Sequence, residues 1–313
     1  MTAREFTVAA NGLVFDGLRW GPGDGTSVVC LHGFPQRCTS YTAVAERLAD
    51  TGLQVVAPDQ RGYSPGARPG QVADYALPQL VADAVAIIEA LGAPVHLVGH
   101  DWGGVVGWQV AMRRPDLLAS WTALSTPSPM ALAEVLSRRE DPAGDEQRAR
   151  FGYMNLFRQE GTAERILLAD EGTALAAVYG GFVPAERVAE DVAFFAVPGV
   201  LTAALSWYRA MSRADADGLT PVTVPTTYLW GSGDPAFGRA AAESTGRFVD
   251  ADYRFLPLEG ASHWLPDEVP DAVATAIGAE CGRPADPGRN QYAPALPGRD
   301  HHLDHSHEGL PTC

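Results

Sequence analysis

The feature that most constrains this chain is the pentapeptide Gly-His-Asp-Trp-Gly at positions 99–103. Residues 95–98 before it are typical of a short buried strand, and residues 104–112 after it are typical of a helix with small residues where it packs closely. A strand that turns so tightly into a helix is a nucleophile elbow, in which the glycines leave room for the turn and one side chain is presented at the tip. The side chain at this tip is Asp101.

An aspartate at the tip changes the chemistry that the elbow can perform. The usual serine needs a base to remove its proton, whereas a carboxylate is already an anion at neutral pH. Attack by a carboxylate on an ordinary ester would give a reactive anhydride. Attack on a saturated carbon that bears a strained ring or a leaving group gives a stable ester that water can later cleave. Asp101 therefore favours an epoxide or an alkyl halide as the electrophile.

Composition excludes several other classes of protein. The chain has 313 residues, 46% of them hydrophobic, which suffices for one large domain with an insertion or for two smaller domains. A formal charge of −15 disfavours nucleic acid and anionic lipid as partners. All 23 basic residues are arginine, so a Schiff-base lysine, a P-loop lysine and a Ser-Lys dyad are excluded. No dinucleotide-binding, H-E-x-x-H or EF-hand motif occurs, and we expect neither a cofactor nor a metal.

The cysteines and the hydrophobic pattern bear on the compartment. The four cysteines form no C-x-x-C pair, which favours free thiols in a reducing compartment. Residues 1–12 lack the apolar core of a signal peptide, and no run of about eighteen apolar residues occurs. The sequence predicts a cytoplasmic protein with no membrane partner, and it leaves a homodimer open.

Short apolar runs alternate with helical patterns over much of the chain. Helical stretches are predicted at 42–50, 77–91 and 104–113. Strands are predicted at 28–31, 54–57, 95–99, 120–125, 226–230 and 253–256. Ahead of them, residues 6–8 and 13–20 flank Asn11-Gly12, a strong hairpin signal. The fold class is therefore α/β, a mostly parallel sheet with helices on both faces and an antiparallel start.

The alternation stops between residues 127 and 221, where alanine-rich helical segments follow one another. We interpret 127–221 as a helical cap inserted into a core made of 1–126 and 222–282. The helices of the cap are predicted near 130–139, 148–159, 185–195 and 199–213. Residues 283–313 are rich in proline, glycine and histidine, and we expect a disordered polar tail there rather than a metal site.

Two residues after the elbow are candidates to complete a catalytic triad, whose chain order with such an elbow is nucleophile, acid, histidine. Asp234 directly follows the predicted strand 226–230 and so lies at the carboxyl edge of the sheet, where sites in α/β folds gather. The alternative for Asp234 is a turn residue before Pro235. His263 lies in a loop after the last predicted strand, and its alternative is an ordinary surface histidine.

The turn His-Gly-Phe-Pro at 32–35 follows the predicted strand 28–31 and would pass over the elbow. There the backbone N–H of Phe34, with that of Trp102, would supply the two donors of an oxyanion hole. The alternative is a plain glycine-proline turn.

Four stretches together resemble those of α/β-hydrolase-fold epoxide hydrolases. They are Gly-His-Asp-Trp-Gly-Gly at 99–104, the turn at 32–35, Asp-Gln-Arg-Gly-Tyr-Ser at 59–64 and Ser-His-Trp at 262–264. The resemblance spans residues 6–278 and implies the α/β-hydrolase fold. Haloalkane dehalogenases share the elbow with its aspartate. We expect the substrate pocket to be lined by Phe34, Trp102, Phe157 and Trp264.

The resemblance also implies two cap tyrosines that hydrogen-bond the epoxide oxygen. Tyr153, in Phe-Gly-Tyr-Met-Asn-Leu-Phe at 151–157, and Tyr208, in Ser-Trp-Tyr-Arg-Ala at 206–210, match those positions. A phenol can donate a hydrogen bond or a proton to the oxygen that becomes negative as the ring opens. The alternative is that both rings only pack the cap. The chain departs from the family where many relatives place a proline before Gly161.

The sequence thus predicts a cofactor-independent epoxide hydrolase that acts on a small apolar epoxide and water. In this scheme Asp101 forms a hydroxyalkyl ester, which water activated by His263 then cleaves. A haloalkane or haloacid dehalogenase is the nearest alternative, because it would use the same ester chemistry. A ligand-binding protein that keeps the fold without turnover is the other.

Overall fold

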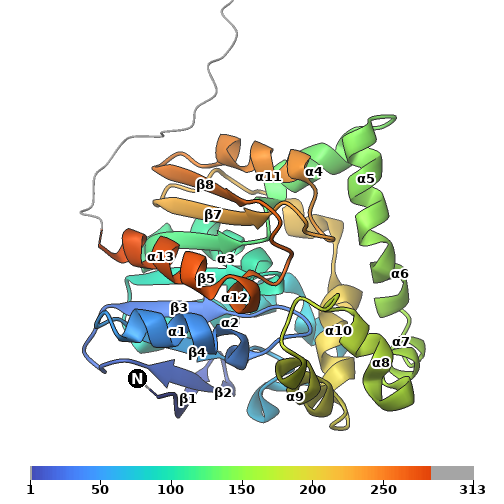
Figure 1. Cartoon of the computed structure of the whole chain (residues 1–313), viewed down its shortest axis with the longest axis horizontal. Helices are drawn as coiled ribbons and strands as arrows, with labels where there is room; N and C mark the ends of the chain where they lie inside the picture. The colour runs from blue at the N-terminus through green and yellow to red at the C-terminus, as the bar shows by residue number, and fades with distance from the viewer. Residues whose placement is uncertain (1, 283–313) are drawn as a thin grey trace, which may run out of the picture.

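The computed structural model describes residues 2–282 and contains one eight-stranded sheet with the order β1-β2-β4-β3-β5-β6-β7-β8 (Figure 1). The six strands β3 to β8 run parallel to one another, whereas β2 is antiparallel to both of its neighbours, β1 and β4. The strands are β1 Arg4–Ala10, β2 Leu13–Trp20, β3 Ser27–Leu31, β4 Gln54–Pro58, β5 Val95–His100, β6 Leu118–Leu124, β7 Thr226–Gly231 and β8 Tyr253–Leu258. The predicted strands and the α/β fold class are confirmed.

The antiparallel start is a hairpin with a two-residue turn. Ala10 pairs with Leu13, and the two residues between them, Asn11 and Gly12, have φ values of 48° and 74°. Asparagine and glycine tolerate this left-handed backbone, and its twist matches that of the two strands.

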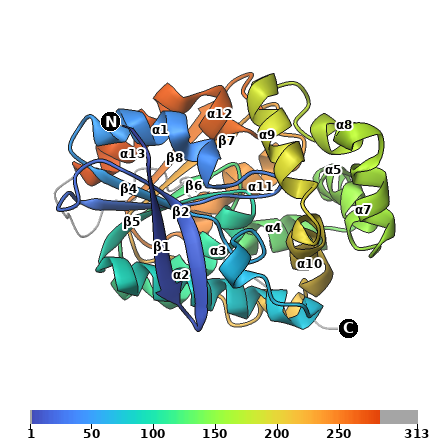
Figure 2. The ribbon, with the colours of Figure 1, turned by 90° about the horizontal axis from the view of Figure 1, so that it is seen from below.

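Helices cover both faces of the sheet, and successive residues of a strand point into different cores. In β3, Val29 and Leu31 pack into one core, and Val28 and Cys30 pack into the other. Figure 2 shows α1 and α13 on one side of the strands and α2 and α3 on the other. The helices of this region are α1 Thr42–Ala49, α2 Leu77–Leu91, α3 Trp102–Arg113, α11 Arg239–Ser244, α12 Leu265–Glu268 and α13 Pro270–Cys281. Burial on both faces explains why the parallel strands are almost wholly apolar.

The chain between β6 and β7 is helical, apart from its connecting loops. Most of it lies together at one side of the sheet, as α5 to α10 show (Figures 1 and 2). Its helices are α4 Pro129–Ser137, α5 Pro142–Arg150, α6 Met154–Phe157, α7 Thr162–Leu167, α8 Ala169–Ala177, α9 Ala185–Phe195 and α10 Val200–Ala210. We call residues 127–221 the cap.

The cap differs from its prediction in two places. The single helix expected at 148–159 is broken, because α5 ends at Arg150 and the single 3-10 turn Phe151–Tyr153 leads into α6. The helices α7 and α8 were not predicted. Near the start of α8, Asp170, Glu171 and Gly172 have positive φ values that interrupt the helical backbone, so this region leaves no long periodic pattern in the sequence.

Two further expectations concern the C-terminal tail and membrane-spanning helices. The predicted tail at 283–313 lies outside the described residues. Within residues 2–282 no single helix is long and apolar enough to cross a membrane, and α9 and α10 meet that requirement only as a pair bent by 88°.

Candidate active site

Asp101 sits where β5 passes into α3, with φ 51° and ψ −117°. Few residues other than glycine adopt a positive φ, and such a strained backbone persists only where the surroundings enforce it. The surroundings here are crowded: a Cβ atom on Gly99 would overlap the carbonyl oxygen of Gly103, and one on Gly103 would overlap that of Leu31. The glycines of the motif are thus required by close approach of the backbone.

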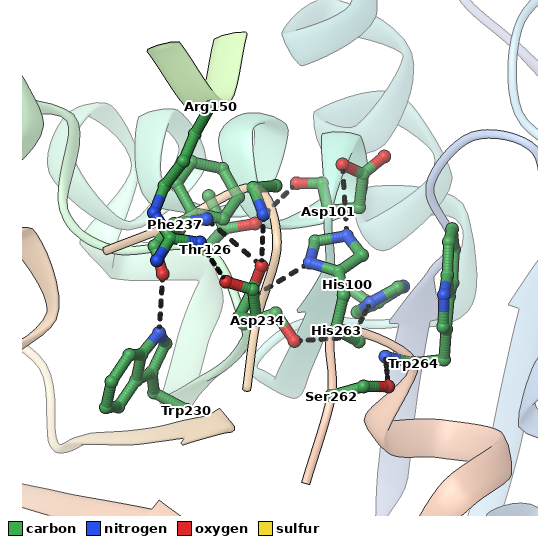
Figure 3. A network of polar contacts seen from close by, with 12 residues as sticks. His100, Asp101, Thr126, Arg150, Trp230, Asp234, Phe237, Ser262, His263 and Trp264 are labelled. Carbon is green, nitrogen blue, oxygen red and sulfur yellow. Dashed lines mark hydrogen bonds and ion pairs between the residues drawn. The ribbon is translucent and has the colours of Figure 1, made fainter. Parts of the chain in front are cut away.

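Asp101, His263 and Asp234 come together from three separate strand ends (Figure 3). His263 Nδ1 lies 2.9 Å from Asp234 Oδ2, and His263 Nε2 lies 3.5 Å from Asp101 Oδ2. The second oxygen of Asp234 accepts hydrogen bonds from the backbone amides of Ala236 (2.7 Å) and Phe237 (3.0 Å). All three triad side chains are buried. Asp234 therefore orients the imidazole, and Nε2 is directed at the nucleophile.

The three groups determine one another's charge. Burial alone would raise the pKa of Asp101, but the hydrogen bond and charge of His263 outweigh it and hold the pKa below its usual value. Burial alone would lower the pKa of His263, but the charges of Asp234 and Asp101 raise it instead. The resting site therefore holds an imidazolium between two carboxylates.

The loop that carries His263 is anchored by its own carbonyl oxygen. This oxygen accepts hydrogen bonds from His100 Nε2 at 2.8 Å and from the Ser125 hydroxyl at 2.7 Å. Because burial lowers the pKa of His100 to about 3, its ring is neutral and carries its proton on Nε2. The histidine within the elbow thus positions the catalytic loop, a role that the sequence did not indicate.

Phe34 already contacts the nucleophile in the resting structure. Its backbone N–H donates to Asp101 Oδ1 at 2.8 Å, and a Cβ atom on Gly33 would collide with the same carboxylate. Trp102 is the first residue of α3, so its N–H is among those at a helix start that have no acceptor within the helix. The Phe34 amide therefore faces an oxygen of Asp101, and the Trp102 amide lies next to Asp101 in the chain at the start of α3.

The turn that carries Phe34 is held by the Asp-Gln-Arg-Gly loop at 59–62. The Gln60 backbone N–H donates to His32 Nε2 at 3.1 Å, so that nitrogen is an acceptor and the ring proton lies on Nδ1, which donates to the Gly33 carbonyl oxygen at 3.1 Å. The Gln60 side chain donates to the His32 carbonyl oxygen at 2.6 Å. These two sequence motifs therefore form one structural unit.

A cavity of about 410 Å³ lies between the core and the cap. Asp101 and His263 line it from the core, and Tyr153 and Tyr208 line it from the cap. Burial raises the pKa of Tyr208 well above the usual value, the pKa of Tyr153, a residue that is 37% exposed, is raised as well, and the nearby charge of Asp101 adds to both shifts. Both phenols therefore stay protonated and can donate a hydrogen bond. Most of the remaining wall is apolar and includes Phe34, Phe157, Leu167, Val178 and Trp264.

Trp102 differs from its prediction as a pocket residue. Its ring does not line the cavity and packs instead edge-on against Trp207 and Tyr208, with centroids 5.5 Å and 5.1 Å away. A hydrogen bond from its side chain, whose one polar group is the indole N–H, holds the pKa of Tyr208 down against the effect of burial. Trp102 thus contacts Tyr208 on the side away from the cavity, because its side chain, the first of α3, points away from the cavity.

Arg150 is a basic residue in the cavity wall that the sequence did not single out. Its guanidinium donates to the Asp234 carbonyl oxygen and, at 2.6 Å, to Glu146. It thus ties the end of α5 to the loop of the triad acid (Figure 3). Among residues 2–282 no cluster of three or more His, Cys, Asp and Glu side chains is arranged to hold a metal ion.

The comparisons with known proteins agree with this geometry. The model of the Alpha/beta hydrolase family matches residues 28–276. The chain belongs to this family. Epoxide hydrolase A of Mycobacterium tuberculosis is 29% identical to it, over 87% of this chain and 95% of the relative. The AB hydrolase superfamily protein YfhM of Bacillus subtilis is 31% identical, over 86% of this chain and 95% of the relative.

A solved structure of the family supports the same fold. The crystal structure of Epoxide Hydrolase A from Mycobacterium thermoresistibile has a TM-score of 0.77 and 28% sequence identity, and it covers 89% of this chain and 98% of its own. The family relationship therefore extends through both the core and the cap.

Proposed function

We propose that this protein is an epoxide hydrolase that opens a small apolar epoxide to a vicinal diol through an ester on Asp101. The observation that carries the proposal is the pair of protonated phenols, Tyr153 and Tyr208, in the same cavity as an ionised carboxylate nucleophile. Ring opening needs both, because a nucleophile attacks carbon while a donor stabilises the departing oxygen. Relatives that bear the name epoxide hydrolase support it.

In the first half-reaction, the two oxygens of Asp101 have different tasks. Oδ1 is held by the Phe34 N–H, so Oδ2 is the oxygen that attacks an epoxide carbon. The C–O bond of the ring breaks, and its electron pair moves to the oxygen, which takes a hydrogen bond or a proton from Tyr153 and Tyr208. The product is a β-hydroxyalkyl ester in which Oδ1 is the carbonyl oxygen.

In the second half-reaction, water attacks the carbonyl carbon of that ester. Esterification removes the charge of Asp101 and lowers the pKa of His263, so the imidazolium loses its proton, which replaces the proton that a tyrosine gave to the epoxide oxygen, and the free Nε2 can accept a proton from water. The negative charge develops on Oδ1, which the backbone N–H groups of Phe34 and Trp102 stabilise. The bond between the carbonyl carbon and Oδ2 then breaks, and Oδ2 leaves with the diol and takes the proton that remained on the attacking water oxygen. This restores the Asp101 carboxylate and the His263 imidazolium, and no cofactor takes part in the scheme.

A single-turnover isotope experiment tests the proposal. Enzyme whose Asp101 carboxylate carries ¹⁸O, prepared by turnover in labelled water, is mixed with less than one equivalent of styrene oxide in ordinary water. We expect labelled diol, because one oxygen of the product comes from Asp101. Unlabelled diol would show direct attack by water and would overturn the covalent scheme.

A substrate panel tests the reaction class. Terminal, internal and aromatic epoxides are compared with haloalkanes and fluoroacetate, with diol and halide release as readouts. Diol formation supports the proposal. Halide release without diol would identify a dehalogenase, and binding without either product would identify a ligand-binding protein.

A further inference from the structure

Tyr179 connects the cap to the turn that carries Phe34. Its hydroxyl oxygen lies 2.8 Å from the Pro35 carbonyl oxygen and 2.7 Å from Asp191 Oδ2. Tyr179 follows α8, Asp191 lies within α9, and Pro35 is the residue after Phe34. The ring of Tyr179 also packs on Trp264, with centroids 4.9 Å apart. One phenol thus touches both sides of the catalytic cavity.

The number of protons limits how these two contacts can form. A phenol has one proton to donate, and a carbonyl oxygen can only accept. Both short contacts are hydrogen bonds only if Tyr179 donates to Pro35 and Asp191 donates to Tyr179. Asp191 must then be a carboxylic acid. If Asp191 were ionised, it would compete for the single phenol proton, and two acceptor oxygens would be left without a hydrogen between them.

The other oxygen of Asp191 supports the same protonation state. Asp191 is 1% exposed, and its Oδ1 has no hydrogen-bond partner among the described residues. A buried carboxylate oxygen without a donor costs far more free energy than the unpaired oxygen of a neutral acid. Arg37 and Arg187 lie near Asp191, but their ion pairs are with other carboxylates: Arg37 lies 3.8 Å from Asp59 and Arg187 lies 2.9 Å from Glu190.

Some groups around Asp191 raise its pKa and others lower it. Burial raises its pKa to about 7, the charges of Arg37 and Arg187 act to lower it, and the charge of Asp267 acts to raise it. The remaining neighbour with a titratable side chain is Tyr63, whose pKa burial raises well above the usual value. Tyr179 and Asp267 line a surface groove of about 1150 Å³, so solvent reaches the edge of this cluster.

We propose that Asp191, as a neutral acid, and Tyr179 form a latch between the cap and the Phe34 turn, and that this latch positions the Phe34 N–H for the oxyanion. Asp191 and Tyr179 touch no reacting atom, so they are positioning residues. The kinetic part of the proposal rests on the proposed function, whereas the protonation state does not.

Loss of the Asp191 proton releases the latch. The ionised carboxylate accepts the hydrogen bond of the Tyr179 hydroxyl, and the Pro35 carbonyl oxygen loses its donor. The turn then holds the Phe34 N–H less firmly, and hydrolysis of the ester slows. The hydrogen bond that is lost corresponds to about a two- to tenfold change in rate, which appears as the pH rises through the range in which Asp191 ionises.

The variant Asp191→Asn separates the latch from other titrations. The amide NH₂ of asparagine donates to the Tyr179 oxygen at every pH, so the latch stays closed. We follow decay of the ester intermediate by stopped-flow tryptophan fluorescence from about pH 5 to about pH 9. The rate for wild type, divided by the rate for the variant, should fall about two- to tenfold over that range. Glu186→Gln makes the same change from a carboxyl group to an amide at an exposed position of α9. As a control, it should show the same dependence of the rate on pH as wild type.

A spectroscopic measurement tests the proton itself without any substrate. At about pH 5 wild type should show one more infrared carboxylic-acid carbonyl component than Asp191→Asn, which separates Asp191 from Asp267, a second buried acid whose pKa burial raises to about 6, and this component should disappear from wild type as the pH rises. A missing band, or a rate ratio that is constant with pH, would overturn the latch. If no epoxide gave an ester intermediate, the proposed function would fail, and the infrared result would still decide the state of Asp191.

Discussion

The floor and the roof of the catalytic cavity are built in different ways. The floor consists of Asp101, His263 and Asp234, at the ends of core strands, and its side chains are held by hydrogen bonds to backbone amides and to one another. The roof carries Tyr153 and Tyr208, and its contacts are mostly between aromatic rings: Phe157 lies 5.2 Å and 5.0 Å from these two rings.

This difference between hydrogen bonds in the floor and ring contacts in the roof indicates which substitutions the cavity tolerates. Directional hydrogen bonds and crowded glycines leave the floor one geometry, because even a Cβ atom on Gly33 would collide with Asp101. Ring contacts in the roof are less directional, so a neighbouring ring can be replaced by one of similar size with less effect. We therefore expect substitutions in the floor to abolish a chemical step, and substitutions in the roof to slow one.

The largest effect is expected at the nucleophile. Asp101→Ala removes the atom that forms the ester, so diol formation should fall by at least roughly a thousandfold. The fold should be retained, because alanine removes a buried charge and keeps the backbone atoms of the elbow. Diol assays and circular dichroism check both parts. Near-normal diol formation in this variant would exclude the role of Asp101.

The next effect separates the two half-reactions within the floor. In His263→Gln the nucleophile remains but the base is lost, so one epoxide should be opened and the ester should persist. Intact-protein mass spectrometry should show a mass increase equal to that of the substrate, located on the Asp101 peptide. If no adduct formed with any accepted substrate, the two-step scheme would be wrong.

A smaller effect is expected in the roof. Tyr153→Phe and Tyr208→Phe each remove one donor and keep the ring, and each should slow ester formation by about a hundredfold, or about 3 kcal/mol. The double variant should be close to inactive. Stopped-flow fluorescence resolves this step. Wild-type rates in both single variants would show that these tyrosines only pack the cap.

The smallest effect concerns the link between roof and floor. Because the pKa of Asp191 is about 7 in the folded protein against an ordinary value of 3.8, the folded state binds a proton that the unfolded state has lost. The stabilisation that the Asp191 proton contributes is fully present below pH 3.8, the ordinary pKa. It decreases as the pH rises toward the folded-state pKa of about 7, and above that pKa it no longer changes with pH. The slope is at most about 1.4 kcal/mol per pH unit. Urea unfolding should show this slope in wild type and lose it in Asp191→Asn; equal slopes would count against the neutral acid.

The sequence predicted the floor well because local rules govern it. Glycines around a lone Asp101 indicate an elbow, and residues that directly follow strands must lie at the carboxyl edge of the sheet. The bounds of α2 were predicted without error at 77–91 because its apolar positions recur with helical spacing. The break at 151–153 was missed although it contains Gly152, because a single glycine inside a helical pattern is tolerated and does not by itself mark a helix end.

Other features depended on contacts between distant segments. The Tyr179 hydroxyl meets Pro35 across 144 residues of chain, and His100 meets the His263 carbonyl oxygen across 163. Neither contact has a sequence pattern, because any polar side chain near a strand or helix end satisfies the same local rules. The sequence by itself determined the fold class and predicted Asp101 as the nucleophile and the order of the triad, since these follow from turn geometry and hydrophobic period. Only the tertiary structure brought both phenols into the same cavity as Asp101 and placed the Asp191 carboxyl group where we propose that it is neutral, because burial and proton sharing arise where separate segments pack together.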